Sequence, residues 1–255
     1  MNKRRYRFWA TLLDAYTTYC KAQYIWEKYW GWSDNPRYTL EEFEQKSLQD
    51  LLDSLNRVEG APIEVADRGT CFNEIIDCII LNRPTKREDM TIKSDNMKAT
   101  ITATLHGFTF EFPIAVCKEF ASRYMMDGAR AVPQFKCEGV LHLPTADVTL
   151  YGYIDELMPF GIHDIKTTGS YEVGKYKANW QHKVYPYCMA QMGDKDVQYF
   201  QYDVLEINGK QFNTYTEHYK VELDVAEIEL GWVCSDLIEF IEEHRNEIKN
   251  ENLFK

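Results

Sequence analysis

The predicted fold rests on the segment Gly152-Tyr153-Ile154-Asp155-Glu156-Leu157-Met158-Pro159-Phe160-Gly161-Ile162-His163-Asp164-Ile165-Lys166. A hairpin that turns at Pro159 places Asp155 opposite Asp164. Cross-strand neighbours hold their Cβ atoms about 5 Å apart, and Lys166, two residues beyond Asp164, points to the same face. Two carboxylates and an ammonium group therefore converge. Like charges this close repel unless a proton or a cation lies between them, so we predict a site for a hard ion such as Mg²⁺, which binds oxygen ligands.

An alternative interpretation is that these charged residues form the solvated face of an antiparallel sheet. The neighbouring residues favour a metal site, because one face of the hairpin is apolar and the other carries aromatic rings beside the charges. The apolar residues are Ile154, Leu157, Ile162 and Ile165, and the aromatic ones are Tyr151 and Tyr153. Exposed salt bridges contribute little to stability, so stability alone gives a weak reason for this arrangement.

A helical stretch is predicted from about residue 175 to 192, after the hairpin. Gln181 and Tyr185 are four residues apart on it, so they lie on one face, one turn apart. Both side chains can hydrogen-bond to a phosphate or to a carboxylate ligand. Taken alone, the pair also fits ordinary residues at the boundary of an apolar stripe.

Taken together, Gly-Tyr-Ile-Asp155, Asp164-Ile-Lys166 and Gln181-x-x-x-Tyr185 resemble the RecB-like branch of the PD-(D/E)XK nuclease superfamily, over about residues 60 to 225. The resemblance implies an α/β (α+β) protein with a restriction-endonuclease-like core, in which helices flank a central mixed sheet. It also implies a metal-dependent DNA nuclease. In that family's pattern the metal ligands are Asp155, Asp164 and the backbone carbonyl of Ile165. Lys166 would orient a water molecule, and Gln181 and Tyr185 would position the strand.

Two upstream segments extend the resemblance. Glu138 lies on a predicted strand where this branch often carries an acidic residue, which would complete or support the metal shell. The segment Gly69-Thr-Cys-Phe-Asn73-Glu74 resembles the first helical motif, but Asn73 stands where the family usually has His. An amide oxygen can bind a hard metal but lacks the imidazole nitrogen that suits Mn²⁺. Glu74 is an alternative ligand, or a solvent-facing acid near a helix N-terminus.

Composition indicates one domain with an elaboration, because 255 residues with 45% hydrophobic and 14% aromatic content can bury a sizeable core. We expect an aromatic-rich helical cap over residues 1–58 and a nuclease core with a C-terminal hairpin and helix over residues 59–255. The aromatic residues of the cap, Trp9 among them, either pack the cap against the core or stack on unpaired bases. No apolar run approaches the roughly 20 residues that span a bilayer, and the start does not resemble a signal peptide. We therefore expect a cytoplasmic protein of a bacterium or of a phage-infected host, with no membrane partner.

The seven cysteines are scattered and include no C-x-x-C pair. Some RecB-like relatives hold an iron–sulfur cluster with four cysteines, which requires a closely spaced set near one end of the domain. Only Cys234 lies beyond Cys188. We predict reduced thiols and no iron–sulfur cluster.

The net charge of −11 is unusual for a DNA-binding protein, since Lys and Arg contacts to phosphate dominate such binding. The charge is unevenly placed, with four Lys and two acids from residue 163 to 187, and ten acids and two basic residues from 222 to 251. We take Lys175, Lys177 and Lys183 as candidate DNA contacts. Two alternatives remain: a nuclease fold that binds DNA or protein without cleavage, and an acidic protein that binds a basic partner through its C-terminal helix.

The expected order of elements leads to the same core. Residues 1–57 are expected to form two helices, the second beginning near Thr39. The further elements are a helix over 67–81, strands over 100–105 and 108–112, a helix over 114–126, strands over 135–143, 148–155 and 161–166, the helix carrying Gln181, a hairpin over 198–221 through Asn208-Gly209, and a helix over 224–249. We expect DNA as substrate, in recombination, repair or phage replication, with exonuclease activity implied by the resemblance. A homo-oligomer or a recombination partner protein is compatible with this sequence.

Overall fold

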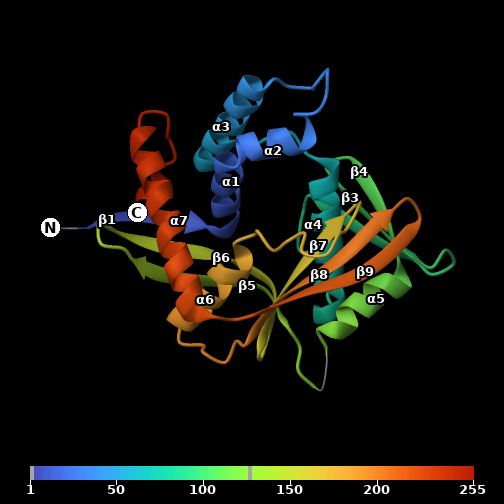
Figure 1. Cartoon of the computed structure of the whole chain (residues 1–255). Helices are drawn as coiled ribbons and strands as arrows, with labels where there is room; N and C mark the ends of the chain where they lie inside the picture. Colours follow the sequence, from blue (N-terminus) through green and yellow to red (C-terminus); the bar gives the residue numbers. More distant parts are fainter. Residues whose placement is uncertain (1–2, 126–127) are drawn as a thin grey trace.

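The computed structural model describes residues 3–125 and 128–255, which form an α+β fold with a mixed sheet flanked by helices (Figure 1). This agrees with the class expected from the sequence. The elements in chain order are β1 Arg4–Trp9, α1 Ala10–Cys20, α2 Ala22–Tyr29, α3 Leu40–Asn56, α4 Glu64–Leu81, β2 Met90–Asp95, β3 Thr100–Leu105, β4 Phe108–Pro113, α5 Ile114–Arg123, β5 Val132–His142, β6 Ala146–Met158, β7 Gly161–Thr168, α6 Gln181–Gln191, β8 Tyr199–Asn208, β9 Gln211–Lys220, α7 Leu223–Glu243 and the 3₁₀ helix η1 Glu251–Phe254.

The main sheet has six strands in the order β1-β6-β7-β8-β9, with β5 paired to β6. The β1–β6 and β7–β8 pairs are parallel, and the others are antiparallel. A separate sheet of three strands, β2-β3-β4, lies beside α4 (Figure 1). The fold therefore combines one large mixed sheet with a small antiparallel one.

The long strand β6 has two successive partners along one of its edges. β5 pairs with it over residues 147–157, and therefore occupies the other edge. β1 pairs with β6 only as far as Tyr151, and β7 begins to pair only at Glu156. Within the described residues, positions 152–155 of β6 thus have no strand partner on this edge. The sheet opens at the point where Asp155 lies.

Two apolar cores cover opposite sides of the sheet. The larger core joins β1, β5, β6 and β8 to helices α1, α3, α6 and α7. The smaller core packs α4 and α5 against the small sheet, with Ile165 and Leu205 contributed by the main sheet. Figure 1 shows α1, α2 and α3 gathered together, and α6 and α7 beside the β5–β6 half of the sheet. Strands β7 and β8 contribute side chains to both cores and therefore lie between two packed layers.

The N-terminal segment differs from the two helices expected. Residues Arg4–Trp9 form a strand of the main sheet, and three helices follow it. Tyr6 and Phe8 are fully buried in the larger core, so the segment before residue 58 shares its core with the rest of the chain. The alternation of polar and aromatic residues over 4–9 is short, and pairing with a distant strand decides it. The start near Thr39 is confirmed, because Thr39 and Glu42 form a capping box.

Several other helix and strand boundaries differ from the predicted ones. α6 begins at Gln181 instead of residue 175, because a turn with Gly174 in the left-handed conformation precedes it. α5 ends at Arg123, and position 126 of the predicted helix lies outside the described residues. Strand β2 was not predicted, and α7 ends at Glu243. The turns at residues 159–160 and 106–107 are confirmed. The turn predicted at Asn208-Gly209 lies one residue later, at 209–210, because Asn208 still pairs with Gln211. Across residues 3–125 and 128–255, none of the helices has the length and apolar character needed to cross a membrane.

Candidate functional site

Asp155 lies where both ladders of β6 are interrupted. The register of β6 with β7 is the predicted one, but the paired residues end at Glu156 and His163, one step before the two aspartates. The carboxylate of Asp155 instead accepts a hydrogen bond of 2.9 Å from the backbone N–H of Ile165. On the other edge, Gln134 of β5 interrupts the ladder opposite Asp155. The side chain of Asp155 thus takes the place of a backbone partner.

Gln134 gives the physical cause of this interruption. Its φ of 53° is in the left-handed region, which residues other than Gly rarely adopt. Its amide also donates a hydrogen bond of 3.4 Å to Asp155. Beyond this point the faces of β6 exchange, because Ile154 packs in the larger core and Met158 packs against the smaller one. Strand alternation alone would place these two residues on the same face, so the distortion at Asp155 reorients the end of the strand.

Three further side chains, those of Lys166, Gln181 and Tyr185, join the two carboxylates. The Nζ of Lys166 lies 2.6 Å from Oδ2 of Asp164 and donates a hydrogen bond of 2.8 Å to Oε1 of Gln181. The amide of Gln181 donates in turn to Asp164 and to the hydroxyl of Tyr185. The structure therefore brings together Asp164, Lys166, Gln181 and Tyr185, as the spacing predicted. Gln181 reaches the carboxylate and the ammonium directly, so its position fixes their geometry.

Close packing holds the Tyr185 ring against Gly152. A Cβ added at Gly152 would lie 2.4 Å from a ring carbon of Tyr185, which is shorter than any van der Waals contact. We expect Gly152→Ala to lower the free energy of unfolding by about 1–3 kcal/mol, the usual cost of overpacking. Urea unfolding measures this. Gly169→Ala is the matched control, because a Cβ there meets nothing within 4 Å, and an equal loss in both variants would contradict the explanation.

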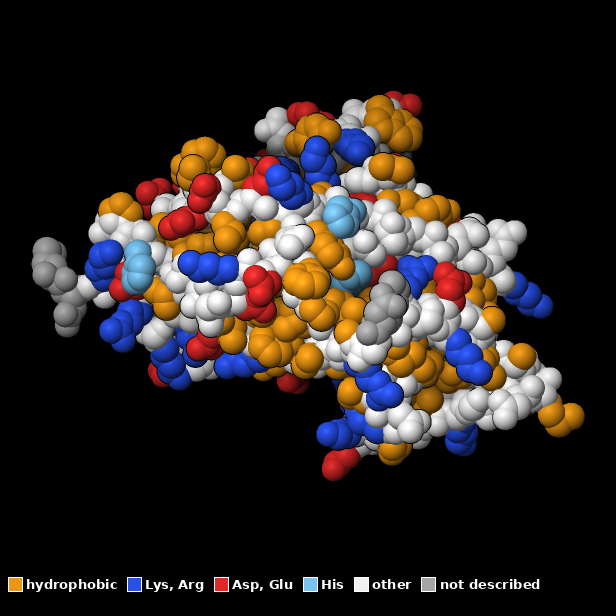
Figure 2. All heavy atoms as spheres, turned by 90° about the horizontal axis from the view of Figure 1, so that it is seen from below, with side chains coloured by type: hydrophobic (Ala, Val, Ile, Leu, Met, Phe, Trp, Pro, Cys, Tyr) orange, Lys and Arg blue, Asp and Glu red, His pale blue; other side chains and the backbone are white. Residues whose placement is uncertain are grey.

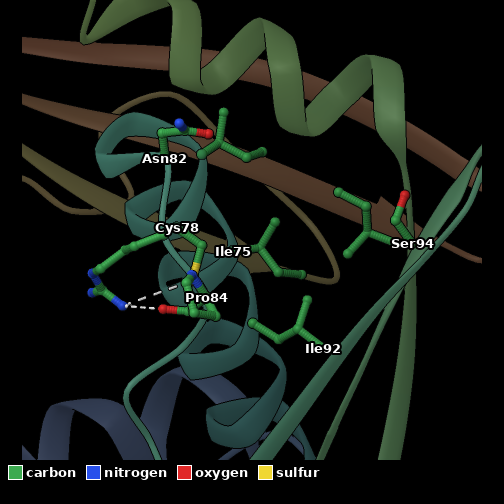
Figure 3. A pocket seen from close by; sticks show the side chains of 9 residues that line it. Ile75, Cys78, Asn82, Pro84, Ile92 and Ser94 are labelled. Carbon is green, nitrogen blue, oxygen red and sulfur yellow. Dashed lines mark hydrogen bonds between the residues drawn. The ribbon is translucent and has the colours of Figure 1, made fainter.

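An open cavity of about 420 Å³ contains both carboxylates. Its lining includes Asn73, Gln134, Asp155, Asp164, Ile165, Lys166, Gln181, Tyr185, Trp9, Arg57 and Tyr151. A second hollow, of about 510 Å³, lies between α4 and the small sheet, with Ile75, Cys78 and Ile92 on its walls (Figure 3). No Asp, Glu or His lines the second hollow among the described residues. The second hollow therefore offers no carboxylate or imidazole for acid–base or metal chemistry.

The buried charges at the site are not balanced. Burial and the neighbouring carboxylate of Asp164 raise the pKa of Asp155 to about 7, although Lys166 opposes this. Burial also raises the pKa of Asp164, which is only 2% exposed, against the effect of Lys166 and Gln181. Burial would lower the pKa of Lys166, but the two aspartates outweigh it and raise that pKa. Two carboxylates face a single ammonium group, so a further positive charge would be stabilised here.

The donor atoms fit a hard divalent cation. The Nδ2 of Asn73 donates to Asp155 at 3.2 Å, while its Oδ1 is buried and accepts no hydrogen bond. Buried polar atoms are rarely left without a partner, and an amide oxygen is a common ligand of hard ions. Among the described residues, no three His, Cys, Asp or Glu side chains are grouped as metal ligands. Asp155 and Asp164 would therefore supply two carboxylates to such an ion. Asn73 now presents Nδ2 to Asp155, so its oxygen would join this set only after the amide turns over.

Two of the predicted metal ligands lie elsewhere. Glu138 is half exposed and pairs with Lys136 at 3.3 Å. Glu74 pairs with Arg83 at 3.1 Å. Successive helical residues point about 100° apart, so the helix that aims Asn73 at Asp155 turns Glu74 away. Neither acid lines the cavity, and both assignments are corrected.

The three lysines proposed as DNA contacts also lie outside the cavity lining. Lys175 donates to Thr168 and Ser170, Lys183 pairs with Glu229 at 2.7 Å, and Lys177 is exposed. Figure 2 shows Lys and Arg side chains scattered among apolar ones over the face seen from below, and the described residues form no continuous basic band in this view. Lys175, Lys177 and Lys183 therefore do not line this cavity.

Several residues at or near the site were not identified from the sequence. Gln134 and Arg57 line the cavity. Asp14 of α1 accepts a hydrogen bond of 2.7 Å from the backbone N–H of Trp180, at the start of α6. Burial raises the pKa of Asp14 to about 6. No local motif marks these residues, since each reaches the site from a distant part of the chain.

Comparisons with known proteins give little further information. Neither the known family models nor the curated protein sequences match this chain. A solved structure described as the crystal structure of SSO0001 is similar over 94% of this chain and 79% of that chain, with a TM-score of 0.41 and 11% sequence identity. This similarity is too low to support an argument about fold or function.

Proposed function

We propose that this protein is a metal-dependent DNA nuclease with a restriction-endonuclease-like core, resembling RecB-like PD-(D/E)XK nucleases and working on DNA in the cytoplasm of a bacterium or a phage-infected host. The observation that supports it best is that Asp155, Asp164 and Lys166 line one open cavity. Gln181 forms hydrogen bonds with both Asp164 and Lys166. Stability does not require this arrangement, because it buries uncompensated negative charge. Exonuclease rather than endonuclease activity is implied by the resemblance alone.

Each side chain has a distinct role in this proposal. Asp155 and Asp164, with Asn73 and the Ile165 carbonyl, would hold Mg²⁺ or Mn²⁺. A bound ion supplies a water of lowered pKa and offsets charge on the scissile phosphate. The ammonium of Lys166 orients that water and stabilises the negative charge of the transition state. Gln181 is a positioning residue, because its amide holds Asp164 and Lys166 in place.

Cleavage of end-labelled DNA tests the proposal. Linear and closed circular DNA are incubated with the wild type and with Lys166→Ala, in Mg²⁺, Mn²⁺ or EDTA. We expect metal-dependent loss of DNA that Lys166→Ala slows by at least about 10²-fold, the usual effect of removing one transition-state donor. Lys195→Ala is the control, because Lys195 is exposed and outside the cavity. Survival of the circles would show that the enzyme needs an end.

Absence of cleavage with either metal would overturn the nuclease proposal. DNA binding without cleavage would then support a binding module of the same fold. Asn73 favours this alternative, because its amide donates a hydrogen bond to the carboxylate of Asp155 that would otherwise bind the metal. Asn73→His distinguishes the two cases further. If the amide limits a functional enzyme, this variant gains activity with Mn²⁺, since imidazole suits that ion better than an amide does.

A further inference from the structure

Trp9, Arg57 and Tyr151 line one side of the cavity, and Arg7 lies over the Tyr151 ring beside them. We name these four residues the rim cluster. The parallel register of β1 and β6 places Trp9 beside Tyr151, with ring centroids 6.2 Å apart. Arg7, two residues before Trp9, shares its face, and its guanidinium lies 4.9 Å from the Tyr151 ring. The cluster therefore alternates positive charges with aromatic faces on the surface of two paired strands.

Arg57 reaches the cluster from the end of α3. Its guanidinium lies 4.2 Å from the Trp9 ring and donates a hydrogen bond to the hydroxyl of Tyr151. Its backbone has a φ of 51°, a left-handed conformation that residues other than Gly seldom adopt. The side chain is nevertheless exposed, and no carboxylate of the described residues forms an ion pair with it. The fold thus places an exposed guanidinium over an aromatic ring, with no carboxylate of the described residues paired to it.

Such a group suits one chemical class of ligand. The edge of a guanidinium binds a phosphate through paired N–H donors. Its flat face, and the faces of Trp and Tyr, stack on nucleobases. We infer that the rim cluster binds an unpaired nucleotide of the substrate strand, with Arg57 on its phosphate and the aromatic faces against its base. This inference rests on the proposed nuclease function and specifies its substrate as a single strand or a frayed end.

The position of the cluster along β6 connects it to the proposed metal site. Tyr151, Tyr153 and Asp155 alternate along the strand, and Tyr153 is 55% exposed. With a rise of about 3.4 Å per residue, Tyr151 and Asp155 are about 14 Å apart. All three residues line the same cavity. A strand whose phosphate lies at Asp155 can therefore place a neighbouring base on the rim cluster, provided that base is not paired in a duplex.

Binding of labelled oligodeoxyribonucleotides tests this inference. Fluorescence anisotropy is measured with Mg²⁺ in the Lys166→Ala background, which separates binding from cleavage. The ligands are a short single strand, the same strand without bases, and a blunt duplex. We expect Trp9→Ala to weaken binding of the intact single strand roughly 5- to 100-fold, the range for loss of one base stack. The baseless strand and the duplex should change by less than about twofold.

The variants separate phosphate binding from stacking. Arg57→Ala should weaken binding of both the intact and the baseless strand, while Trp9→Phe should retain most of the single-strand affinity. Arg37→Ala is the matched control, because Arg37 lies 5.3 Å from the Tyr38 ring but outside the cavity. Thermal unfolding of each variant checks that it folds.

The two proposals can fail separately. An equal loss for intact and baseless strands in Trp9→Ala, or normal affinity in Arg57→Ala, would overturn the rim cluster as a nucleotide site. Single-strand binding that depends on the rim cluster, combined with no cleavage by the wild type, would retain the rim cluster and remove the nuclease function.

Discussion

Replacing Asp155 by Asn is expected to lower the cleavage rate by about 10³-fold or more and, at the same time, to stabilise the metal-free protein above neutral pH. The loss of rate follows from the proposed role of Asp155 as a metal ligand, since Asn keeps the shape but removes the charge that holds the cation. The gain in stability follows from burial beside Asp164, which raises the pKa of Asp155 to about 7. A purely structural carboxylate would not combine these two effects.

The pH dependence gives the sign of the stability effect. Because the pKa of Asp155 is higher in the folded protein than in the unfolded chain, the folded state binds the extra proton. The contribution of protonated Asp155 to the free energy of unfolding is therefore fully present below about pH 4, the ordinary pKa of Asp. This contribution is lost as the pH rises through about 7. The Asn variant lacks this decrease. We expect it to exceed the wild type by about 1–3 kcal/mol at pH 8, since one pKa unit corresponds to about 1.4 kcal/mol.

Urea unfolding in EDTA at pH 5 and pH 8 measures this difference. Addition of Mg²⁺ at pH 8 should stabilise the wild type and leave Asp155→Asn almost unchanged, because ligand binding to the folded state adds to its stability. Asp196→Asn serves as the control, since Asp196 is exposed. Equal Mg²⁺ stabilisation of both aspartate variants would show that the cation does not bind at Asp155.

The grouping of the central residues could be predicted because local rules determine it. A hairpin with a tight turn fixes the cross-strand register, so the approach of Asp155 to Asp164 followed from nine residues of spacing. Lys166 followed from strand alternation, and Gln181 and Tyr185 from helical spacing. These rules act within one or two elements. The geometry agrees with them, while the roles of these residues in catalysis stay predictions.

The rest of the site could not be predicted because it depends on contacts between distant segments. β1 looked like part of a helix, and only its pairing with β6 makes it a strand that brings Trp9 to the cavity. Gln134 acts through a left-handed backbone that no sequence pattern requires. Glu138 was assigned to the site by resemblance, but the residue of β5 that reaches Asp155 lies four positions earlier. Tertiary pairing, not propensity, decided each of these cases.

A buried polar network lies behind the site, on the opposite face of β7. His163, which precedes Asp164, lies on this face, and its Nδ1 lies 2.8 Å from a carboxylate oxygen of Asp203. Asp203 is fully buried and also accepts hydrogen bonds of 3.0 Å from Arg123, Tyr124 and Gln201. Burial alone would raise the pKa of Asp203, but His163, Gln201 and Arg123 outweigh it and hold that pKa below its usual value. None of these residues lines the cavity. We therefore infer that the network stabilises strand β7.

We expect Asp203→Ala to lower the free energy of unfolding by about 3–5 kcal/mol, the cost of leaving a buried partner charge uncompensated. The variant leaves the guanidinium of Arg123, the hydroxyl of Tyr124 and the ring of His163 without their shared acceptor. Asp203→Asn, which retains the size and one acceptor oxygen, should lose less. Urea unfolding at pH 7 measures both, and Asp196→Ala, an exposed control, should change by less than about 0.5 kcal/mol.

The effect of Asp203→Ala should also depend on pH with a sign opposite to that of Asp155. Because the folded pKa of Asp203 is depressed, its stabilisation is present above the ordinary Asp pKa of about 4 and is lost as the pH falls through the lower folded value. The difference between the wild type and Asp203→Ala should therefore shrink in acid. A difference that is constant from pH 7 to pH 3 would show that packing, not the charge of Asp203, supports β7. Since β7 carries Asp164 and Lys166, that result would also separate the rigidity of the site from its buried electrostatics.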